Sequence, residues 1–260
     1  MIYLNGSQIN TTFFPDNTSQ VWKLSERLLS EDLCTVHWEY QSEGEFLQLA
    51  QLKALLDSYK KVVSLIITYL PYGRQDKKVS NDSTFALVPF TNLLNYLNFS
   101  SVTIVDPHSN IAIDLIIGAI AQYPVSKVFN AAALTDTTLL CFPDKGAVTK
   151  YSGVYNFLDY IYGDKVRDQA TGYITKYNLI GVPTWQNVLI VDDICDGGAT
   201  FKLLAKELIF YGASNVNLFV THGIFSNGLA TLKESGIERI FTNKGEVVES
   251  SGSIVYRHNG

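Results

Sequence analysis

The stretch "VLIVDDICDGGATF", residues 188–201, joins four aliphatic residues to three aspartates and a glycine pair. The aliphatic run predicts a buried strand, and the sequence after the glycines predicts a helix. Asp192 and Asp193 are adjacent carboxylates that repel each other, which a buried strand alone does not require. The segment is therefore either a solvated turn, for which Asp and Gly are usual residues, or a site that needs two acceptors facing a ligand.

Short apolar runs rich in Val and Ile alternate with helix-like segments along the rest of the chain. Strands are predicted at 62–68, 102–106, 138–142, 187–193 and 216–222, and helical spacing of apolar residues marks 84–98 and 200–211. This alternation predicts an α/β fold with mainly parallel sheets flanked by helices. The segment "QYPVSK" (122–127) is the expected boundary. This boundary divides the chain into two similar domains, 1–124 and 125–260. The last strand could still return to the sheet of the first domain.

Composition narrows the class of protein. A net charge of −5 and a pI of 5.4 argue against nucleic acid as a partner. The three cysteines are far apart and form no CxxC pair, which predicts free thiols in a reducing compartment. The first residues resemble no signal peptide, and the longest apolar stretch is too short to cross a bilayer. We therefore expect a cytoplasmic protein with no membrane partner.

The residues after Val191 have the chemistry of a sugar-phosphate site. A tight glycine turn onto a helix start exposes backbone N–H groups that favour phosphate. Paired carboxylates suit the vicinal hydroxyls of a ribose, because each can accept hydroxyl hydrogens. No Walker A sequence occurs in the chain, which argues against a P-loop nucleotidase. In parallel sheets ligands bind beyond the carboxyl ends of the strands, where this stretch lies.

Five motifs in the same order resemble one family. The stretch 188–200 is similar to the phosphoribosyl-diphosphate motif shared by type I phosphoribosyltransferases and phosphoribosyl diphosphate synthetases. "PYGRQDKK" (71–78) resembles the synthetases' ATP-holding element, which the transferases lack. "VDPHS" (105–109), "FPDKGAVTK" (142–150) and "GDKVRD" (163–168) also resemble synthetase segments. The resemblance implies two tandem type I phosphoribosyltransferase-like domains.

The resemblance also implies roles for individual residues. ATP would be bound by Arg74, Gln75 and Asp76, with Phe14 and Asp16 reaching the adenine of a neighbouring subunit. Lys165 and Arg167 would be catalytic, on a loop that closes over the reaction. The diphosphate loop would be Asp144, Lys145, Gly146, Ala147, Val148 and Thr149. Ribose hydroxyls would meet Asp192 and Asp193, and the 5-phosphate would meet Asp196, Gly197, Gly198, Ala199 and Thr200. Mg²⁺ would be held by His108, Asp144 and Asp192.

The implied activity is transfer of the β,γ-diphosphoryl group of ATP to ribose 5-phosphate, with release of AMP, by a homo-oligomer (a dimer or hexamer). Two departures from the family's pattern matter. Thr18 replaces a glutamate that would contact adenine, and Gly197 replaces a threonine, which predicts extra space beside the 5-phosphate. The alternative acceptor is therefore ADP-ribose, as in divergent phage proteins of NAD salvage. A phosphoribosyltransferase or an inactive regulatory subunit also stays open.

Overall fold

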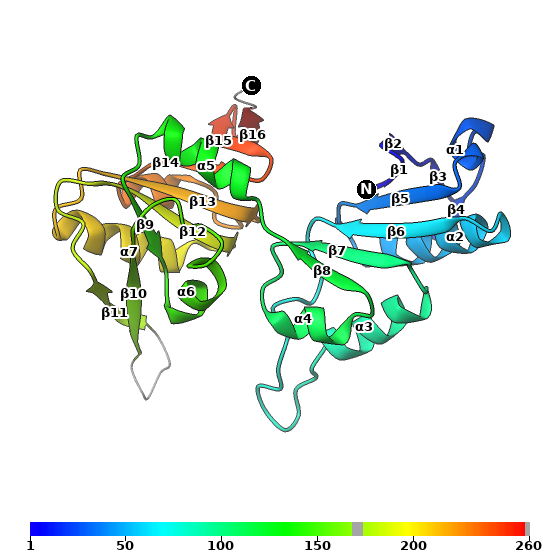
Figure 1. Ribbon diagram of the computed structural model, residues 1–260, viewed down its shortest axis with the longest axis horizontal. Coiled ribbons are helices and arrows are strands. Elements are labelled where there is room, and N and C mark those ends of the chain that lie inside the picture. Colours follow the sequence, from blue (N-terminus) through cyan, green and yellow to red (C-terminus); the bar gives the residue numbers. More distant parts are fainter. Residues whose placement is uncertain (168–173, 258–260) are drawn as a thin grey trace. The chain divides into compact units, whose positions relative to one another are not determined.

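The computed structural model describes residues 1–167 and 174–257 (Figure 1). The chain divides into two compact units, Met1–Tyr123 and Pro124–Gly260. Their mainly parallel sheets and flanking helices confirm the predicted α/β class.

The first unit contains a sheet in the order β2-β1-β5-β6-β7-β8. Its strands are β1 (Ile2–Leu4), β2 (Ser7–Gln8), β5 (Leu33–Trp38), β6 (Val62–Ile67), β7 (Ser101–Val105) and β8 (Ala119–Gln122). Strands β5 to β8 are parallel, and β1 joins β5 in antiparallel pairing. Exposed or partly exposed residues alternate with buried ones along β5 and β6, so one face of each strand points into a core.

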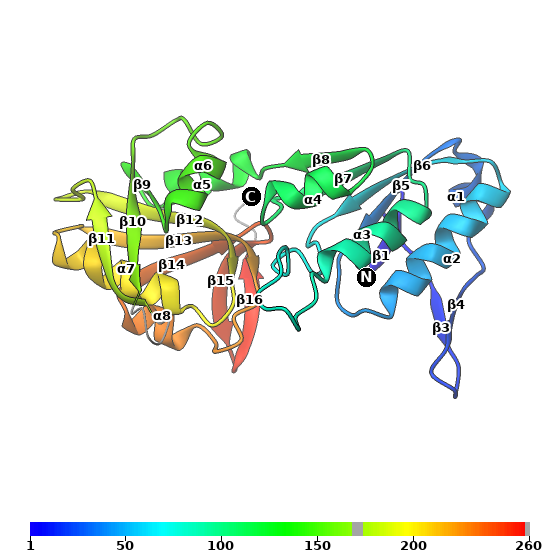
Figure 2. The ribbon, with the colours of Figure 1, turned by 90° about the horizontal axis from the view of Figure 1, so that it is seen from below.

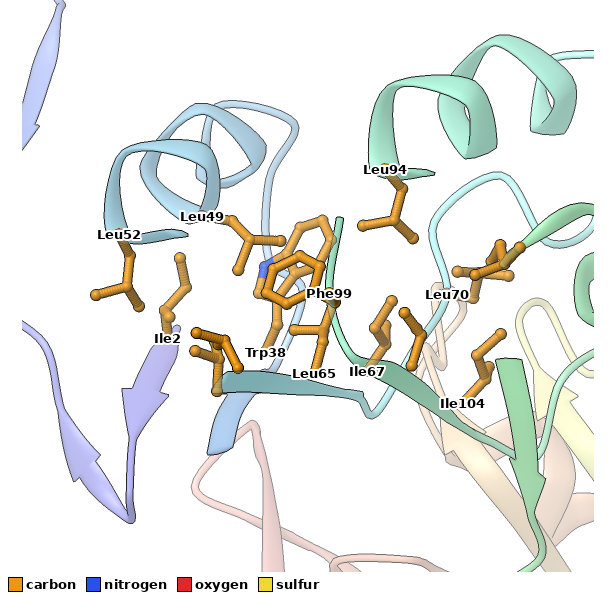
Figure 3. Packing of buried hydrophobic residues seen from close by; sticks show 14 of the residues in the cluster. Ile2, Trp38, Leu49, Leu52, Leu65, Ile67, Leu70, Leu94, Phe99 and Ile104 are labelled. Atoms are coloured by element: carbon orange, nitrogen blue, oxygen red, sulfur yellow. The ribbon is translucent and has the colours of Figure 1, made fainter. Parts of the chain in front are cut away.

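Helices pack on that buried face of the first sheet. They are α2 (Glu45–Ser58), α3 (Leu87–Tyr96) and α4 (Asn110–Leu115), and Figure 1 shows all three on one side of the strands. Figure 3 shows Trp38 and Leu65 from the strands against Leu49 from α2 and Leu94 from α3. Each fully buried aliphatic side chain contributes about 1.5–3 kcal/mol. Pro89 is tolerated in α3 because it lies in the first turn.

A small hairpin precedes these helices. It consists of β3 (Thr11–Phe13) and β4 (Ser19–Val21), followed by the short helix α1 (Glu26–Ser30). Figure 2 shows the hairpin extending away from the sheet of its unit. Its base is fixed to α2, because the backbone N–H of Val21 donates to Gln51 Oε1 at 2.9 Å and Gln51 Nε2 donates to the carbonyl of Ser19 at 2.9 Å.

The second unit contains a sheet in the order β11-β10-β9-β12-β13-β14-β15-β16. Its strands are β9 (Leu139–Phe142), β10 (Tyr160–Arg167), β11 (Ile174–Ile180), β12 (Asn187–Cys195), β13 (Asn215–Gly223), β14 (Ile237–Thr242), β15 (Gly245–Ser250) and β16 (Ser253–Arg257). Strands β9 and β13 have continuous buried runs, which requires cover on both faces. Figure 2 shows α5 (Val125–Leu134) and α6 (Lys145–Tyr151) on one side, and α7 (Ala199–Phe210) and α8 (Ala230–Glu234) on the other.

One detail of this unit differs from the sequence expectation. Strand β12 runs to Cys195 instead of ending at Asp193, because its pairing with β13 continues through Ile194 opposite His222. The sequence left open whether the last strand returns to the first unit, and in the structure β16 belongs to the sheet of the second unit. It pairs with β15 through a tight turn at Ser251 (φ 52°) and Gly252 (φ 77°), a pair of left-handed residues typical of two-residue hairpins.

Within the described residues, no helix is both long and apolar enough to span a bilayer. Cys34, Cys141 and Cys195 are buried free thiols, as their spacing predicted.

Candidate active site

The order of strands reverses beside β9 in the second sheet. The chain leaves β9 to form β10 on one side and later returns to form β12 on the other. Ligands of open α/β sheets bind beyond the carboxyl ends of the strands at such a reversal. Cys141 lies opposite Ile190, so β9 ends near the level of Val191 and β12 projects past it. Asp192 and Asp193 belong to this projecting end of β12, at the position that topology favours for a ligand.

The electrostatics of this aspartate pair indicate a site for a cation or for hydroxyl donors. Burial raises the pKa of Asp192 well above its ordinary value, and the adjacent charge of Asp193 raises it further. The backbone N–H of Asp193 donates to Asp192 Oδ1 at 3.0 Å and partly offsets this effect. Successive Cβ atoms of a strand point to opposite faces, yet these two carboxylates remain close enough to interact. A ligand that supplies positive charge or hydrogen-bond donors would relieve their repulsion.

Lys150 joins this cluster and was missed by the sequence reasoning. Its Nζ lies 3.8 Å from Asp193 Oδ2, and both side chains are largely buried. Its charge also lowers the pKa of Asp192. The available signal was helical spacing: Lys150 lies four residues after Gly146 in the predicted diphosphate loop, and residues four apart share one face of a helix.

The predicted diphosphate loop forms the start of helix α6. Asp144 is its N-cap, and Asp144 Oδ1 accepts a hydrogen bond from the backbone N–H of Ala147 at 2.9 Å. A Cβ on Gly146 would lie 3.1 Å from that oxygen, so glycine leaves room for the cap. Lys145 Nζ lies 3.3 Å from Asp164 Oδ1 in β10, and both side chains are solvent-exposed. Residues 144–149 are therefore a capped helix start with an accessible lysine.

The predicted 5-phosphate loop, residues 196–200, connects β12 to α7. Gly198 occupies the N-cap position of α7 with φ 77°, a conformation that favours glycine, and a Cβ there would approach Leu232 Cδ2 to 2.9 Å. In the described structure no side chain caps this helix. The N–H groups of its first turn therefore face the loop, the arrangement typical of anion binding.

The extra space predicted beside Gly197 is occupied. A Cβ on Gly197 would lie 2.9 Å from Asn227 Nδ2, and that amide donates to the carbonyl of Gly197 at 3.2 Å. Asn227 is exposed on the segment after β13, which packs beside the loop because Ile224 N–H bonds to the carbonyl of Cys195 at 2.8 Å. The expectation of free space is therefore wrong, because a neighbouring side chain occupies the volume that a threonine would take.

In the first unit, the structure brings two of the predicted motifs together. A Cβ on Gly73 would lie 3.9 Å from the Cβ of His108, so the loops after β6 and β7 are adjacent at this point. Arg74 and Gln75 follow Gly73 and are exposed, Asp76 is partly buried, and His108 is exposed. The N–H of Gln75 donates to the carbonyl of Tyr72 at 2.8 Å, which makes the loop a tight turn.

Phe14 and Asp16 lie at the tip of the β3–β4 hairpin. The N–H of Phe14 donates to the carbonyl of Thr18 at 2.9 Å. Asp16 Oδ1 accepts from the Thr18 hydroxyl at 2.7 Å and from the Thr18 N–H at 3.0 Å, and these bonds lower the pKa of Asp16. Phe14 is 41% exposed. The tip therefore presents an aromatic ring and an ionised carboxylate to the surroundings.

Lys165 and Arg167 lie in β10, opposite Tyr177 and Ile174 of β11. The sequence predicted a loop here, but the motif forms a strand up to Arg167, and Asp168 lies outside the described residues.

No cluster of three or more His, Cys, Asp or Glu side chains that could hold a metal occurs in the described part of the chain. His108 belongs to the first unit, and Asp144 and Asp192 belong to the second. Mg²⁺ takes one or two protein carboxylates and completes its shell with water and phosphate oxygens. The repelling pair at Asp192 and Asp193 fits that requirement, so the residues present are compatible with Mg²⁺.

No family model matches the chain. It is 28% identical over 245 residues to the ribose-phosphate pyrophosphokinase of Sulfolobus acidocaldarius, covering 90% of this chain and 83% of that protein. It is 27% identical over 241 residues to the ribose-phosphate pyrophosphokinase of Agrobacterium fabrum, covering 87% and 76%. The phosphoribosylpyrophosphate synthetase of Mycobacterium smegmatis has a similar fold, with a TM-score of 0.71, 18% identity and coverage of 90% and 79%.

Proposed function

Because the chain is a divergent member of the ribose-phosphate pyrophosphokinase family, we propose that it transfers the β,γ-diphosphoryl group of ATP to the anomeric hydroxyl of ribose 5-phosphate. The products are phosphoribosyl diphosphate and AMP. The main support is the match to the ribose-phosphate pyrophosphokinase of Sulfolobus acidocaldarius, which covers 90% of the chain. The chemistry of the β9 and β12 strand ends agrees with it.

The second unit supplies the sugar-phosphate half of the proposed site. The first turn of α7 and residues 196–200 bind the 5-phosphate through backbone N–H groups. Asp192 and Asp193 accept hydrogen bonds from the ribose hydroxyls, and Lys150 holds Asp193. Residues 144–149 and the exposed Lys145 surround the diphosphoryl group that is transferred. These groups position and neutralise charge, which is the main protein contribution to phosphoryl transfer.

The reaction forms one P–O bond and breaks another. The anomeric oxygen attacks the β-phosphorus of ATP, the bond from that phosphorus to the oxygen bridging it to the α-phosphorus breaks, and AMP leaves with that oxygen. The hydroxyl proton passes to solvent. Lys165 and Arg167 stabilise negative charge on the transferred group, and Arg74 and Gln75 hold the phosphates of ATP. His108, Asp144 and Asp192 are the residues that would hold Mg²⁺, which would supply further charge neutralisation on the phosphate oxygens.

The acceptor defines the second candidate. ADP-ribose has the same free anomeric hydroxyl but a substituted 5-phosphate, so it needs room beside the loop of residues 196–200. Asn227 occupies the volume next to Gly197, and it is exposed, which allows it to move. Ribose 5-phosphate needs no such movement and is the first candidate for this reason.

Assembly is part of the proposal. The exposed ring of Phe14 and the carboxylate of Asp16 at the hairpin tip complete the adenine site of a second copy, so the active form is a homo-oligomer with closed symmetry. The enzyme acts in the cytoplasm.

The test is an incubation of the full chain with ATP, Mg²⁺ and either ribose 5-phosphate or ADP-ribose, with products resolved by mass. We expect AMP and phosphoribosyl diphosphate in equal amounts from the first acceptor. A diphosphorylated ADP-ribose would identify the second candidate. ATP left intact with both acceptors would reject the kinase activity and favour a binding protein. Formation of a nucleotide from phosphoribosyl diphosphate and a free base would instead indicate a phosphoribosyltransferase.

A further inference from the structure

Helix α7 of the second unit carries two sets of side chains with the same spacing, and only one of them packs on the sheet. The buried set recurs at i, i+3, i+4 and i+7, the spacing of a core-facing stripe, and consists of Phe201, Leu204, Ala205 and Leu208. The second set begins two residues later and consists of Leu203, Lys206, Glu207 and Phe210. Two residues turn an α-helix by about 200°, so this set forms an outer face of α7 that points away from the sheet (Figure 2).

Large aromatic rings extend the apolar surface at the C-terminal end of this outer face. Phe210 is 79% exposed, and its ring centroid lies 5.2 Å from that of Tyr211 in an edge-on arrangement. Trp185 is 86% exposed and lies beside this end of the helix, because its backbone N–H donates to the carbonyl of Gly212 at 2.8 Å. The rings of Trp185 and Phe210 together present about 300 Å², since one aromatic side chain can bury about 150–250 Å². Apolar patches of about 300–600 Å² are often functional.

The backbone of Trp185 is unusual for a residue with so large a side chain. This residue is third in a turn that is closed by a hydrogen bond from the N–H of Gln186 to the carbonyl of Pro183 at 3.0 Å. Its φ of 60° is left-handed, a conformation that glycine and asparagine favour at this position of a turn. Packing within the unit does not require tryptophan here, because the ring is exposed. A residue held in such a conformation suggests a function, and an exposed ring suggests a contact surface.

Lys206 and Glu207 occupy the middle of the outer face. Residues three and four positions away from each of them carry no opposite charge, so neither charge is neutralised within the helix. The set is self-complementary about its centre. If α7 packs antiparallel on α7 of a second copy, with a twofold axis between residues 206 and 207, each Lys206 faces a Glu207 and each Leu203 faces a Phe210.

We propose that the outer face of α7, flanked by Trp185 and Tyr211, binds a second copy of this chain in an antiparallel helix pair. A parallel pair would place like charges opposite one another at residues 206 and 207. The antiparallel pair also brings Lys202 of one copy toward the ring of Tyr211 of the other, where a cation and an aromatic face attract each other.

Charge on this face favours a second copy over other occupants. The middle of the face carries one positive and one negative side chain, so it has no net charge that would select a basic protein, an acidic protein or an anionic lipid surface. The rings of two copies account for about 600 Å², below the 1,200 Å² or so of standard interfaces. We therefore expect a dissociation constant in the micromolar range.

This contact is separate from the one at the hairpin tip. The hairpin belongs to the first unit and α7 to the second, and neither contact requires the other. The inference also does not depend on the proposed activity, because it rests on the outer face of α7 and not on the residues assigned to substrates.

The experiment measures the mass of the full chain against its concentration by sedimentation and light scattering. Lys206→Glu and Glu207→Lys should each raise the dissociation constant about tenfold, because a twofold contact contains each reversed pair twice. The double variant Lys206→Glu, Glu207→Lys should regain the wild-type constant, since the opposite charges face each other again. Glu249→Lys, at an exposed glutamate of β15, is the control and should not change the mass.

A second variant removes the aromatic anchor. Phe210→Ala should raise the dissociation constant about tenfold to a hundredfold, the effect of losing an anchor residue at an interface. Its melting temperature at low concentration should match the wild type, because the ring is exposed. Tyr96→Ala, at an 87% exposed position at the end of α3, is the matched control and should associate like the wild type.

Three results would overturn the proposal. The first is a wild-type mass that none of the α7 variants changes, whether it is the mass of a monomer at roughly 100 µM or of an assembly made by the hairpin alone. The second is weakening by both single reversals without recovery in the double variant, which would reject the antiparallel twofold pair. The third is binding of the wild type, but not of Phe210→Ala, to phosphatidylcholine vesicles in the absence of self-association, which would assign the face to lipid.

Rates of AMP release decide the proposed function separately. An inactive chain whose association is weakened by the single reversals and regained in the double variant would reject the kinase activity and still support this contact. An active chain with a mass that is insensitive to the α7 variants would do the opposite.

Discussion

Lys150 Nζ lies 3.8 Å from Asp193 Oδ2, and this contact ties helix α6 to the projecting end of β12. The two side chains are only 14% and 7% exposed, so solvent screens the pair weakly. The contact connects the diphosphate loop, which starts α6, with the carboxylates proposed to bind the sugar. The two parts of the site therefore hold one another in position within the second unit.

Removing the lysine charge should affect both stability and activity. Lys150→Met keeps the length of the side chain but leaves Asp193 without its cation. Because an uncompensated buried acceptor costs about 1–3 kcal/mol, we expect a lower melting temperature and weaker binding of the sugar phosphate. Lys150→Arg keeps the charge and should lose much less. A Lys150→Met protein as stable and as active as the wild type would show that the pair is incidental.

The sequence predicted β6, β7, β9, β12 and β13 closely, because long Val- and Ile-rich runs distinguish buried strands from helices. The same reasoning placed the end of β12 two residues too early. Aspartate and glycine usually mark turns. Here the strand stays extended because Ile194 pairs with His222 of β13. The local sequence pattern of a strand does not predict such pairing with a neighbouring strand.

The contacts of single side chains were harder to predict. Motif resemblance pointed to Asp192 and Gly197, but it gave no sign that Asn227, thirty residues later, fills the space beside Gly197. Lys150 was also missed, because the resemblance assigned roles only to residues 144–149 of the motif that ends at Lys150.

Loss of Lys165 tests catalysis directly. We expect Lys165→Ala to keep its melting temperature and to lower turnover by roughly 10²–10³-fold, the range for one preorganised charge-stabilising group. Lys206→Ala, at an exposed position of α7, is the matched control and should leave turnover unchanged. Steady-state rates of AMP release measure both. Equal rates in the two variants would remove Lys165 from the mechanism.

A substitution at Asp192 should weaken the binding of the sugar phosphate much more than the binding of ATP. Asp192→Asn removes one charge from the repelling pair, so the protein should fold normally. The loss of an acceptor for a ribose hydroxyl costs about 1–3 kcal/mol, which weakens sugar-phosphate binding roughly tenfold to a hundredfold. ATP binding should change far less. Calorimetric titration with each ligand separately gives the comparison, and an equal loss for both ligands would argue against a sugar-specific role.

The hairpin tip predicts an oligomer. Phe14→Ala removes the exposed ring at the tip but leaves the hydrogen bonds of Asp16 with Thr18, so each copy should still fold. We expect a raised KM for ATP and unchanged binding of the sugar phosphate. Light scattering of the wild type should show at least a dimer under assay conditions. A fully active monomer would disprove the contribution of a second copy.

The final prediction concerns the acceptor and uses the contact between Gly197 and Asn227. Gly197→Thr is compatible with the backbone, because φ at this position is not left-handed, but the new Cβ would meet Asn227 Nδ2 at 2.9 Å. We expect this single change to displace Asn227 and to lower the use of ribose 5-phosphate by about tenfold, the effect of disturbing one hydrogen bond at the phosphate loop. Asn227→Ala alone should leave the rate with ribose 5-phosphate unchanged. The double variant should regain that rate, because the removed amide makes room for the threonine.

ADP-ribose should respond differently if it is the acceptor. Asn227→Ala would then improve its use by opening the volume beside the loop, and the double variant would lose that gain because the threonine refills it. Rates of AMP release with each acceptor across the four proteins decide the matter. Identical patterns for the two acceptors would mean that neither residue contributes to the choice between them.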